Sequence, residues 1–149
     1  MVKGWSRAAA LCLLAAFVGV GVAGAADAPS LYKRLGGYDA IAAVTDDFIA
    51  RLVADPQFAR FFTGLSKDSA GKLRQHVVEL VCYTSGGPCV YMGRDMKTSH
   101  AGLGITGAEW DASVKHFVAS LDKFKVGEKE KTELLTAVGG LKKDIVEKP

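Results

Sequence analysis

The sequence predicts an all-α fold of one domain, and three observations support that prediction. Apolar residues recur at helical spacing through most of the chain after residue 30. Capping residues precede these segments, and Gly or Asp-Pro pairs follow them. No segment shows the apolar-polar alternation of a half-buried strand. At 149 residues the chain has the length of one domain and can enclose a flat cofactor.

The first 26 residues predict a secretory signal peptide. Lys3 and Arg7 precede an uncharged run from Ala8 to Ala26, which ends in the small residues of a peptidase site. The alternative is an uncleaved membrane anchor, because the run approaches the roughly 18 residues that span a bilayer. Its Ala and Gly content and the cleavage-like site favour the signal peptide. We therefore expect an exported, periplasmic domain of residues 27–149 that has no stable membrane insertion.

Charge and cysteine content restrict the partners of this domain. The formal charge of +3 falls to +1 when Lys3 and Arg7 leave with the signal peptide. A nearly neutral surface gives no reason to expect binding to nucleic acid or to an anionic membrane. Cys82 and Cys89 remain, and in an oxidising compartment they can pair as a disulfide. The alternative is two free thiols.

The first half of the domain predicts four helical segments. Ser30 is placed to cap a short helix that ends at Gly36-Gly37. A long helix follows and stops at Asp55-Pro56, and a short helical turn then runs from Pro56 to Phe62. The apolar face of the long helix carries Ile41, Val44, Phe48, Ile49 and Leu52.

The fourth segment is a helix that begins after a cap at Ser66 or Ser69 and ends near Tyr83. Its predicted buried stripe consists of Leu73, Val77, Leu80 and Val81. At 100° per residue, His76 lies roughly 40° beyond the edge of that stripe. His76 is therefore expected at the margin of the buried face.

A short helix that ends at His100 follows the Gly86-Gly87-Pro88 break and a loop, and Met96 shares its face. This arrangement would offer one imidazole to a metal in an apolar pocket. A capping box at Thr106 to Glu109 then opens a helix that contains Trp110. The last predicted helix, after Gly127, carries Leu134, Leu135, Val138, Leu141 and Ile145 on one face. His116 lies away from the apolar stripe of its helix and is expected to be solvated.

In their order and spacing, these segments resemble the group 1 truncated haemoglobins, short globins in which two helices pack over two. The resemblance covers residues 31–146. It rests on the motifs LYKRLGG at Leu31, DF at Asp47, ADP at Ala54, FF at Phe61, GGP at Gly86, MKTSH at Met96 and GIT at Gly104.

The resemblance implies a 2-on-2 truncated globin fold that encloses one b-type haem, whose iron binds His100 on the proximal side. Cys-x-x-Cys-His is absent from the sequence, so covalent c-type attachment is not indicated. Arg94 and Lys97 are candidates to pair with haem propionates, or are simply solvated. The expected haem-binding residues are His100, Phe62, Leu73, His76, Val77, Leu80, Tyr91, Met96, Ile105 and Trp110.

The distal side departs from the family pattern. Group 1 members usually carry tyrosine at the position of Ile49, and often glutamine at Leu73 or Val77. The three residues of this chain offer no hydrogen-bond donor to a gas ligand. In some members a histidine at the position of His76 binds iron as a sixth ligand; the alternative is a histidine that merely covers the haem edge.

Four function classes remain open from the sequence. The first is reversible binding of oxygen, nitric oxide or carbon monoxide in an apolar distal pocket. The second is electron transfer or redox sensing, with His76 and His100 both on iron and an electron-donor protein as partner. The third is a haem enzyme: a nitric oxide dioxygenase, a nitrite reductase or a peroxidase. The fourth is a helical binding module without haem.

Overall fold

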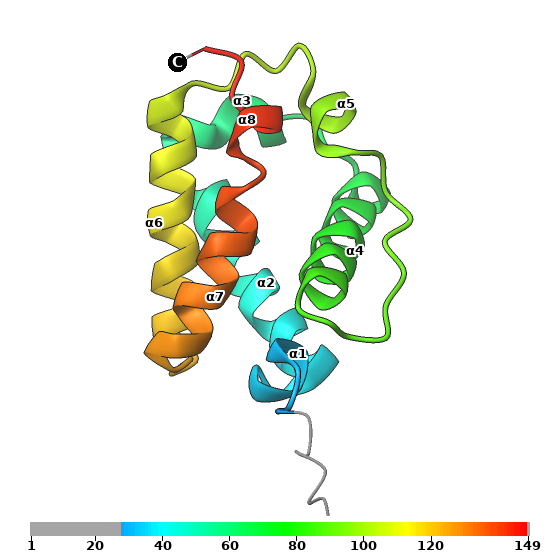
Figure 1. Ribbon diagram of the computed structural model, residues 1–149. Helices are drawn as coiled ribbons and strands as arrows, with labels where there is room; N and C mark the ends of the chain where they lie inside the picture. Colours follow the sequence, from blue (N-terminus) through cyan, green and yellow to red (C-terminus); the bar gives the residue numbers. More distant parts are fainter. Residues whose placement is uncertain (1–27, 149) are drawn as a thin grey trace, which may run out of the picture.

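The computed structural model describes residues 28–148, which form helices joined by loops (Figure 1). Among these residues, the one β pairing is an isolated bridge between Thr106 and Lys148. The all-α prediction is therefore confirmed, whereas the predicted signal peptide lies outside the described residues. The elements are α1 (Leu31–Arg34), α2 (Gly37–Ala54), η1 (Pro56–Phe58), α3 (Ala59–Phe62), α4 (Lys67–Thr84), α5 (Met96–His100), α6 (Gly107–Lys123), α7 (Glu128–Gly139) and α8 (Lys142–Ile145).

Helix α2 packs against both α4 and α6 and so joins the two halves of the molecule (Figure 1). Burial of each large apolar side chain at these contacts contributes about 1.5–3 kcal/mol. No helix within residues 28–148 is long and apolar enough to cross a bilayer. The buried core consists of Ile41, Ala42 and Val44 of α2, Val78, Val81 and Cys82 of α4, Phe117 and Leu121 of α6, and Leu134 of α7.

Helix α4 has a wider apolar surface than the predicted stripe. Val78 lies outside that stripe, yet it is 0% exposed and belongs to the core cluster with α2. Leu73, Val77 and Leu80 instead line a cavity on another side of the helix. Because α4 is covered by α2 on one side and borders a cavity on the other, its apolar arc exceeds one stripe.

The predicted helix caps are present. Ser30 accepts a hydrogen bond from the Lys33 amide, and Ser66, rather than Ser69, caps α4. The hydroxyl of Thr106 accepts from the Glu109 amide, and the Glu109 carboxylate accepts from the Thr106 amide. This capping box fixes the start of α6.

The prediction of one continuous last helix is wrong, because the chain breaks at Gly139 and Gly140. Helix α7 ends at Gly139, and the separate short helix α8 packs against α5. Glycine costs about 0.8–1.0 kcal/mol relative to alanine inside a helix, so two in succession favour a break. The break brings α8 to the helix that carries His100.

Cys82, at the end of α4, forms a disulfide with Cys89 in the loop that follows. The turn between them requires glycine at position 87, because a Cβ there would lie 2.5 Å from the Tyr32 ring and 2.7 Å from Cys82 Sγ. Disulfides persist in oxidising compartments, where the predicted signal peptide would direct the protein. The bridge fixes the loop that leads to Tyr91.

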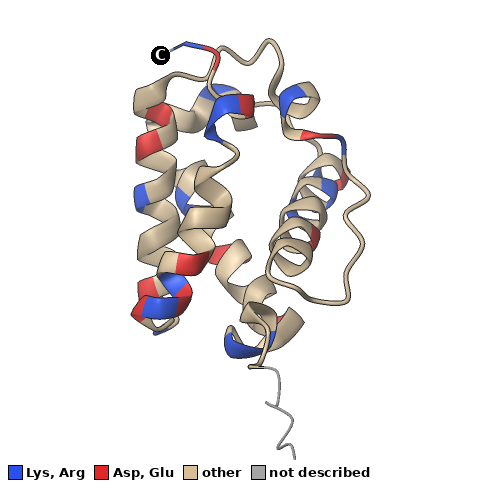
Figure 2. Ribbon diagram, viewed as in Figure 1, with Lys and Arg blue, Asp and Glu red and all other residues tan. Residues whose placement is uncertain are grey.

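Charged residues of both signs meet at the junction of α6 and α7, where Lys131 pairs with Asp122 and Glu128 (Figure 2). A second ionic cluster joins α2 to α6. The Asp47 carboxylate, 13% exposed, accepts hydrogen bonds from Lys123, Arg51 and Ser120. These donors, Lys123 first, hold the pKa of Asp47 far below its ordinary value of 3.8.

We predict that Asp47→Asn lowers the free energy of unfolding by about 1–3 kcal/mol at neutral pH, because hydrogen bonds to a charged acceptor are lost. The folded-state pKa is depressed, so this contribution is complete above the unfolded pKa and is lost as pH falls towards the folded value. Urea unfolding of wild type and variant near pH 7 and near pH 3 measures the difference.

The control for this experiment is Asp68→Asn, which removes a carboxylate from an exposed pair with Lys72. An exposed pair of this kind contributes little, so the control should change stability by less than about 0.5 kcal/mol. A difference between Asp47→Asn and wild type that stays the same at both pH values would contradict the assignment.

Candidate cofactor-binding cavity

A cavity of about 570 Å³ is lined by residues of α2, η1, α3, α4, α5, α6, α7 and α8 and of the loops on either side of α5. This volume lies within the range of roughly 300–1,000 Å³ that is usual for ligand and cofactor pockets. The ten residues expected to bind a cofactor all lie on its wall: Phe62, Leu73, His76, Val77, Leu80, Tyr91, Met96, His100, Ile105 and Trp110.

Aromatic and aliphatic side chains form most of this wall. Phe61 and Phe62 come from α3, and buried Trp110 comes from the first turn of α6. Phe117 also borders the cavity and packs edge to face on Phe48, with ring centroids 5.2 Å apart. Such a mostly apolar wall suits a large apolar ligand.

His100 ends α5, and its ring is held in one orientation. Asp95 caps this helix and accepts hydrogen bonds from both the amide and the hydroxyl of Thr98. His100 Nδ1 lies 2.8 Å from the Met96 carbonyl oxygen. A carbonyl can only accept, so Nδ1 carries the proton of the neutral ring and Nε2 keeps its lone pair. His100 is thus in the tautomer that a metal ligand requires.

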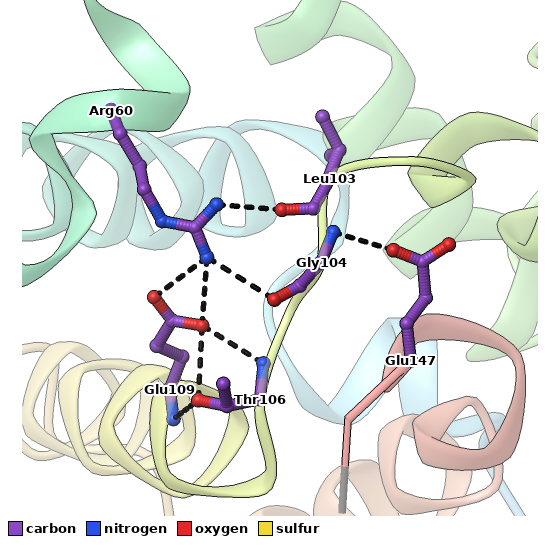
Figure 3. A network of polar contacts seen from close by, with 6 residues as sticks. All are labelled: Arg60, Leu103, Gly104, Thr106, Glu109 and Glu147. Carbon is purple, nitrogen blue, oxygen red and sulfur yellow. Dashed lines mark hydrogen bonds and ion pairs between the residues drawn. The ribbon is translucent and has the colours of Figure 1, made fainter.

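The loop that follows His100 is fixed by side chains from distant parts of the chain (Figure 3). Arg60 of α3 donates to the carbonyl oxygens of Leu103 and Gly104 and to the Glu109 carboxylate. Glu147, next to the C-terminus, accepts from the amides of Gly102 and Gly104. These contacts hold α5 against the remainder of the cavity wall.

Glu109 is a buried carboxylate in this network, and it stays ionised. Its pKa is lowered by the hydrogen bond from the Thr106 amide and also by those from Arg60. The Arg60 guanidinium lies 3.9 Å from the centroid of the Phe61 ring. Arg60 thereby connects the aromatic wall of α3 to the start of α6.

His76 borders the same cavity from α4, and its side chain is 44% exposed. Its ring packs edge to face on Tyr91, with centroids 6.1 Å apart. Nδ1 of His76 lies 3.6 Å from Oε2 of Glu79, beyond hydrogen-bond distance. The pKa of Glu79 is lowered, chiefly by a hydrogen bond from Gln75.

The other hydroxyl donors on the wall are engaged with backbone carbonyls. Tyr91 and Ser99 both donate to the Arg94 carbonyl, at 2.8 and 3.2 Å, and Ser113 donates to the Trp110 carbonyl. Burial raises the pKa of the Tyr91 hydroxyl, which therefore stays protonated. Ile49, Leu73 and Val77 are apolar, so the part of the cavity that they line presents few hydrogen-bond donors to a small ligand.

The prediction of a solvated His116 is wrong. Its side chain is 26% exposed, and Nε2 lies 2.8 Å from Asp55 Oδ2. The ring also packs on Phe58. Helical periodicity could not indicate this contact, because Asp55 lies at the end of a different helix.

Arg94 borders the cavity, as expected for a residue that can meet an anionic group at its edge.

The described residues fit the haem that the resemblance implies. The cavity is apolar and has an appropriate volume, and an oriented imidazole lies on its wall. A second imidazole, that of His76, has its buried Nδ1 unpaired. Sequence reasoning missed Glu109, Arg60 and Glu147 as parts of the wall and its support.

Comparisons with known proteins bear on the family and the fold. A model of the bacterial-like globin family matches residues 30–147. The chain is 33% identical over 120 residues to the group 1 truncated haemoglobin GlbN of Mycolicibacterium paratuberculosis, covering 80% of this chain and 86% of that protein. It is 31% identical over 119 residues to GlbN of a Nostoc species, covering 80% and 98%.

The fold also matches the crystal structure of the 2/2 haemoglobin of a Synechococcus species. The TM-score is 0.72 at 28% identity, and the match covers 80% of this chain and 100% of the Synechococcus chain. That protein was crystallised in the cyanomet state with covalently attached haem.

Proposed function

The chain belongs to the group 1 truncated haemoglobins of the bacterial-like globin family, and on that premise we propose that it binds a diatomic gas reversibly at a haem held by His100. When bound, haem would supply an iron that can take one ligand from the protein and a second, exogenous ligand. The observation that carries the proposal is the hydrogen bond from His100 Nδ1 to the Met96 carbonyl.

That hydrogen bond prepares His100 in two ways. It fixes the tautomer, so that Nε2 is the nitrogen available to iron, and it limits rotation of the ring. It also makes Nε2 a better electron donor, because the partner carbonyl stabilises positive charge on the ring. The anchored loop in Figure 3 keeps the helix that carries this histidine in position.

We propose that the haem is b-type, held without a covalent bond to the protein. The Synechococcus relative was crystallised with covalently attached haem. In this chain Cys82 and Cys89 are bonded to each other, and His116 is engaged with Asp55. None of these three side chains is among the residues that line the cavity.

The apolar wall around Ile49, Leu73 and Val77 favours gases that need no hydrogen bond. A hydrogen bond to a charged partner contributes about 1.5–3 kcal/mol to binding. The absence of such a donor therefore weakens oxygen binding by roughly ten- to a hundredfold. Carbon monoxide and nitric oxide depend less on such a donor. The site therefore discriminates against oxygen relative to relatives that carry a distal tyrosine.

We predict fast dissociation of oxygen from the ferrous protein, and a decrease of roughly ten- to a hundredfold in the dissociation rate in Ile49→Tyr, which adds a hydroxyl to the wall. Ile49→Phe is the matched control, because it adds a ring of similar size without the hydroxyl. Stopped-flow displacement of oxygen by carbon monoxide measures the rate. Slow dissociation in wild type that persists in His76→Ala would contradict the proposal.

A second candidate function is electron transfer or redox sensing with both histidines on iron. The observation that favours it is the position of His76 on the wall of the cavity that contains His100. Two neutral imidazoles keep haem iron low-spin in both oxidation states, which suits repeated electron exchange. A gas would then have to displace His76 before it could bind.

For this candidate we predict a six-coordinate low-spin absorption spectrum in ferric and ferrous wild type. His76→Ala should become five-coordinate or bind water, and it should combine with carbon monoxide faster because no internal ligand must leave. His116→Ala is the control, since that ring faces Asp55. Identical spectra for wild type and His76→Ala would exclude this second function.

A further inference from the structure

Two buried polar atoms on α4 face each other without a hydrogen bond. They are His76 Nδ1 and Glu79 Oε2, the buried side-chain nitrogen and oxygen atoms within residues 28–148 that have no partner. The atoms lie 3.6 Å apart. A normal hydrogen bond requires about 2.7–3.2 Å, so a relative movement of about 0.5–1 Å would form one. Burial of complementary unpaired groups at this distance calls for an explanation.

Hydrogen bonds from other residues hold the Glu79 carboxylate in place. Its second oxygen, Oε1, accepts a hydrogen bond of 2.9 Å from Gln75 Nε2. Gln75 is in turn 3.3 Å from the hydroxyl of Tyr38 on α2. The Met92 amide also faces the carboxylate and helps to lower its pKa. Oε2 itself has no hydrogen-bond partner, so it is the oxygen that remains for His76. The glutamate is thus part of a short polar chain that runs from α2 to the imidazole.

The imidazole is also restricted by Tyr91, whose ring packs edge to face against it. The Cys82–Cys89 disulfide fixes the start of the loop that carries Tyr91. His76 therefore has a ring on one side and a carboxylate at Nδ1. Rotation of the ring would break one contact or the other, and this favours a single orientation.

A carboxylate next to Nδ1 determines which ring nitrogen can bind a metal. The ionised oxygen can only accept, so a hydrogen bond requires the proton of the neutral ring to be on Nδ1. Nε2 then keeps its lone pair. This is the state that the Met96 carbonyl imposes on His100. A carboxylate is the stronger acceptor, and such partners of metal-binding histidines affect metal affinity by about 10- to 100-fold.

We propose that Glu79 is a positioning residue for His76, which it holds with Nε2 available to the haem iron as an internal second ligand. This inference rests on the proposed haem function and goes beyond it, because it assigns the control of gas access to a residue that is not among those lining the cavity. A glutamate that only stabilised α4 would affect unfolding and leave the coordination of iron unchanged.

The test compares Glu79→Leu and Glu79→Gln with wild type, each as the haem-bound protein. Leucine removes the acceptor, whereas glutamine keeps the shape and a weaker acceptor. Asp68→Asn is the control, since it removes a negative charge from the exposed part of the same helix. The first measurement is the fraction of six-coordinate low-spin haem, obtained from absorption spectra and from carbon monoxide binding rates.

The second measurement is ¹⁵N NMR of His76 in the ferrous carbon monoxide complex, which is diamagnetic and leaves His76 off the iron. It reports which ring nitrogen carries the proton. We expect Glu79→Leu to lower the equilibrium constant for His76 binding to iron by about tenfold or more and to abolish the preference for the Nδ1 proton. Glu79→Gln should show an intermediate effect, and Asp68→Asn should match wild type.

The outcomes separate this inference from the proposed function. If Glu79→Leu changes the free energy of unfolding but neither the low-spin fraction nor the His76 tautomer, the positioning role is overturned. It is also overturned if His76→Ala and wild type have the same spectra while haem and carbon monoxide still bind. Failure of the wild type to bind haem or carbon monoxide would instead overturn the proposed function.

Discussion

The hydrogen bond between His100 Nδ1 and the Met96 carbonyl is the interaction on which the site depends. It exists only while α5 is a closed helical turn, and the Asp95 cap starts that turn. Helix α5 must also be held in a fixed position beside the cavity. Arg60, Glu147 and the packing of α8 on α5 provide this fixed position, from parts of the chain about 40 residues away on either side. The orientation of the His100 ring therefore depends on contacts from most of the fold.

The part of the cavity lined by α2 and α4 has no comparable fixed polar contact. Ile49, Leu73 and Val77 supply no donor there, and the Tyr91 hydroxyl is engaged with the Arg94 carbonyl. The polar group that remains on α4 is His76, next to the unpaired oxygen of Glu79. Competition between this imidazole and an external gas would then determine reactivity. The two proposed functions differ only in which ligand prevails.

Features that depend on local sequence could be predicted, and features that depend on packing could not. The caps at Ser30, Ser66 and Thr106 were predictable because each bond joins residues three apart. The order of the motifs predicted residues that line one cavity, including His76 and His100. The burial of Val78 could not be predicted, because helical period does not reveal that α4 has neighbours on two sides. The pairing of His116 with Asp55 likewise joins distant residues.

Replacement of His100 by glycine, followed by rescue with a free ligand, tests most directly whether His100 is the protein ligand of the haem iron. His100→Gly removes the imidazole and leaves a space beside the iron that free imidazole can enter. We expect this variant to lose the wild-type absorption spectrum and added imidazole to restore it. An unchanged spectrum in His100→Gly without imidazole would contradict the claim.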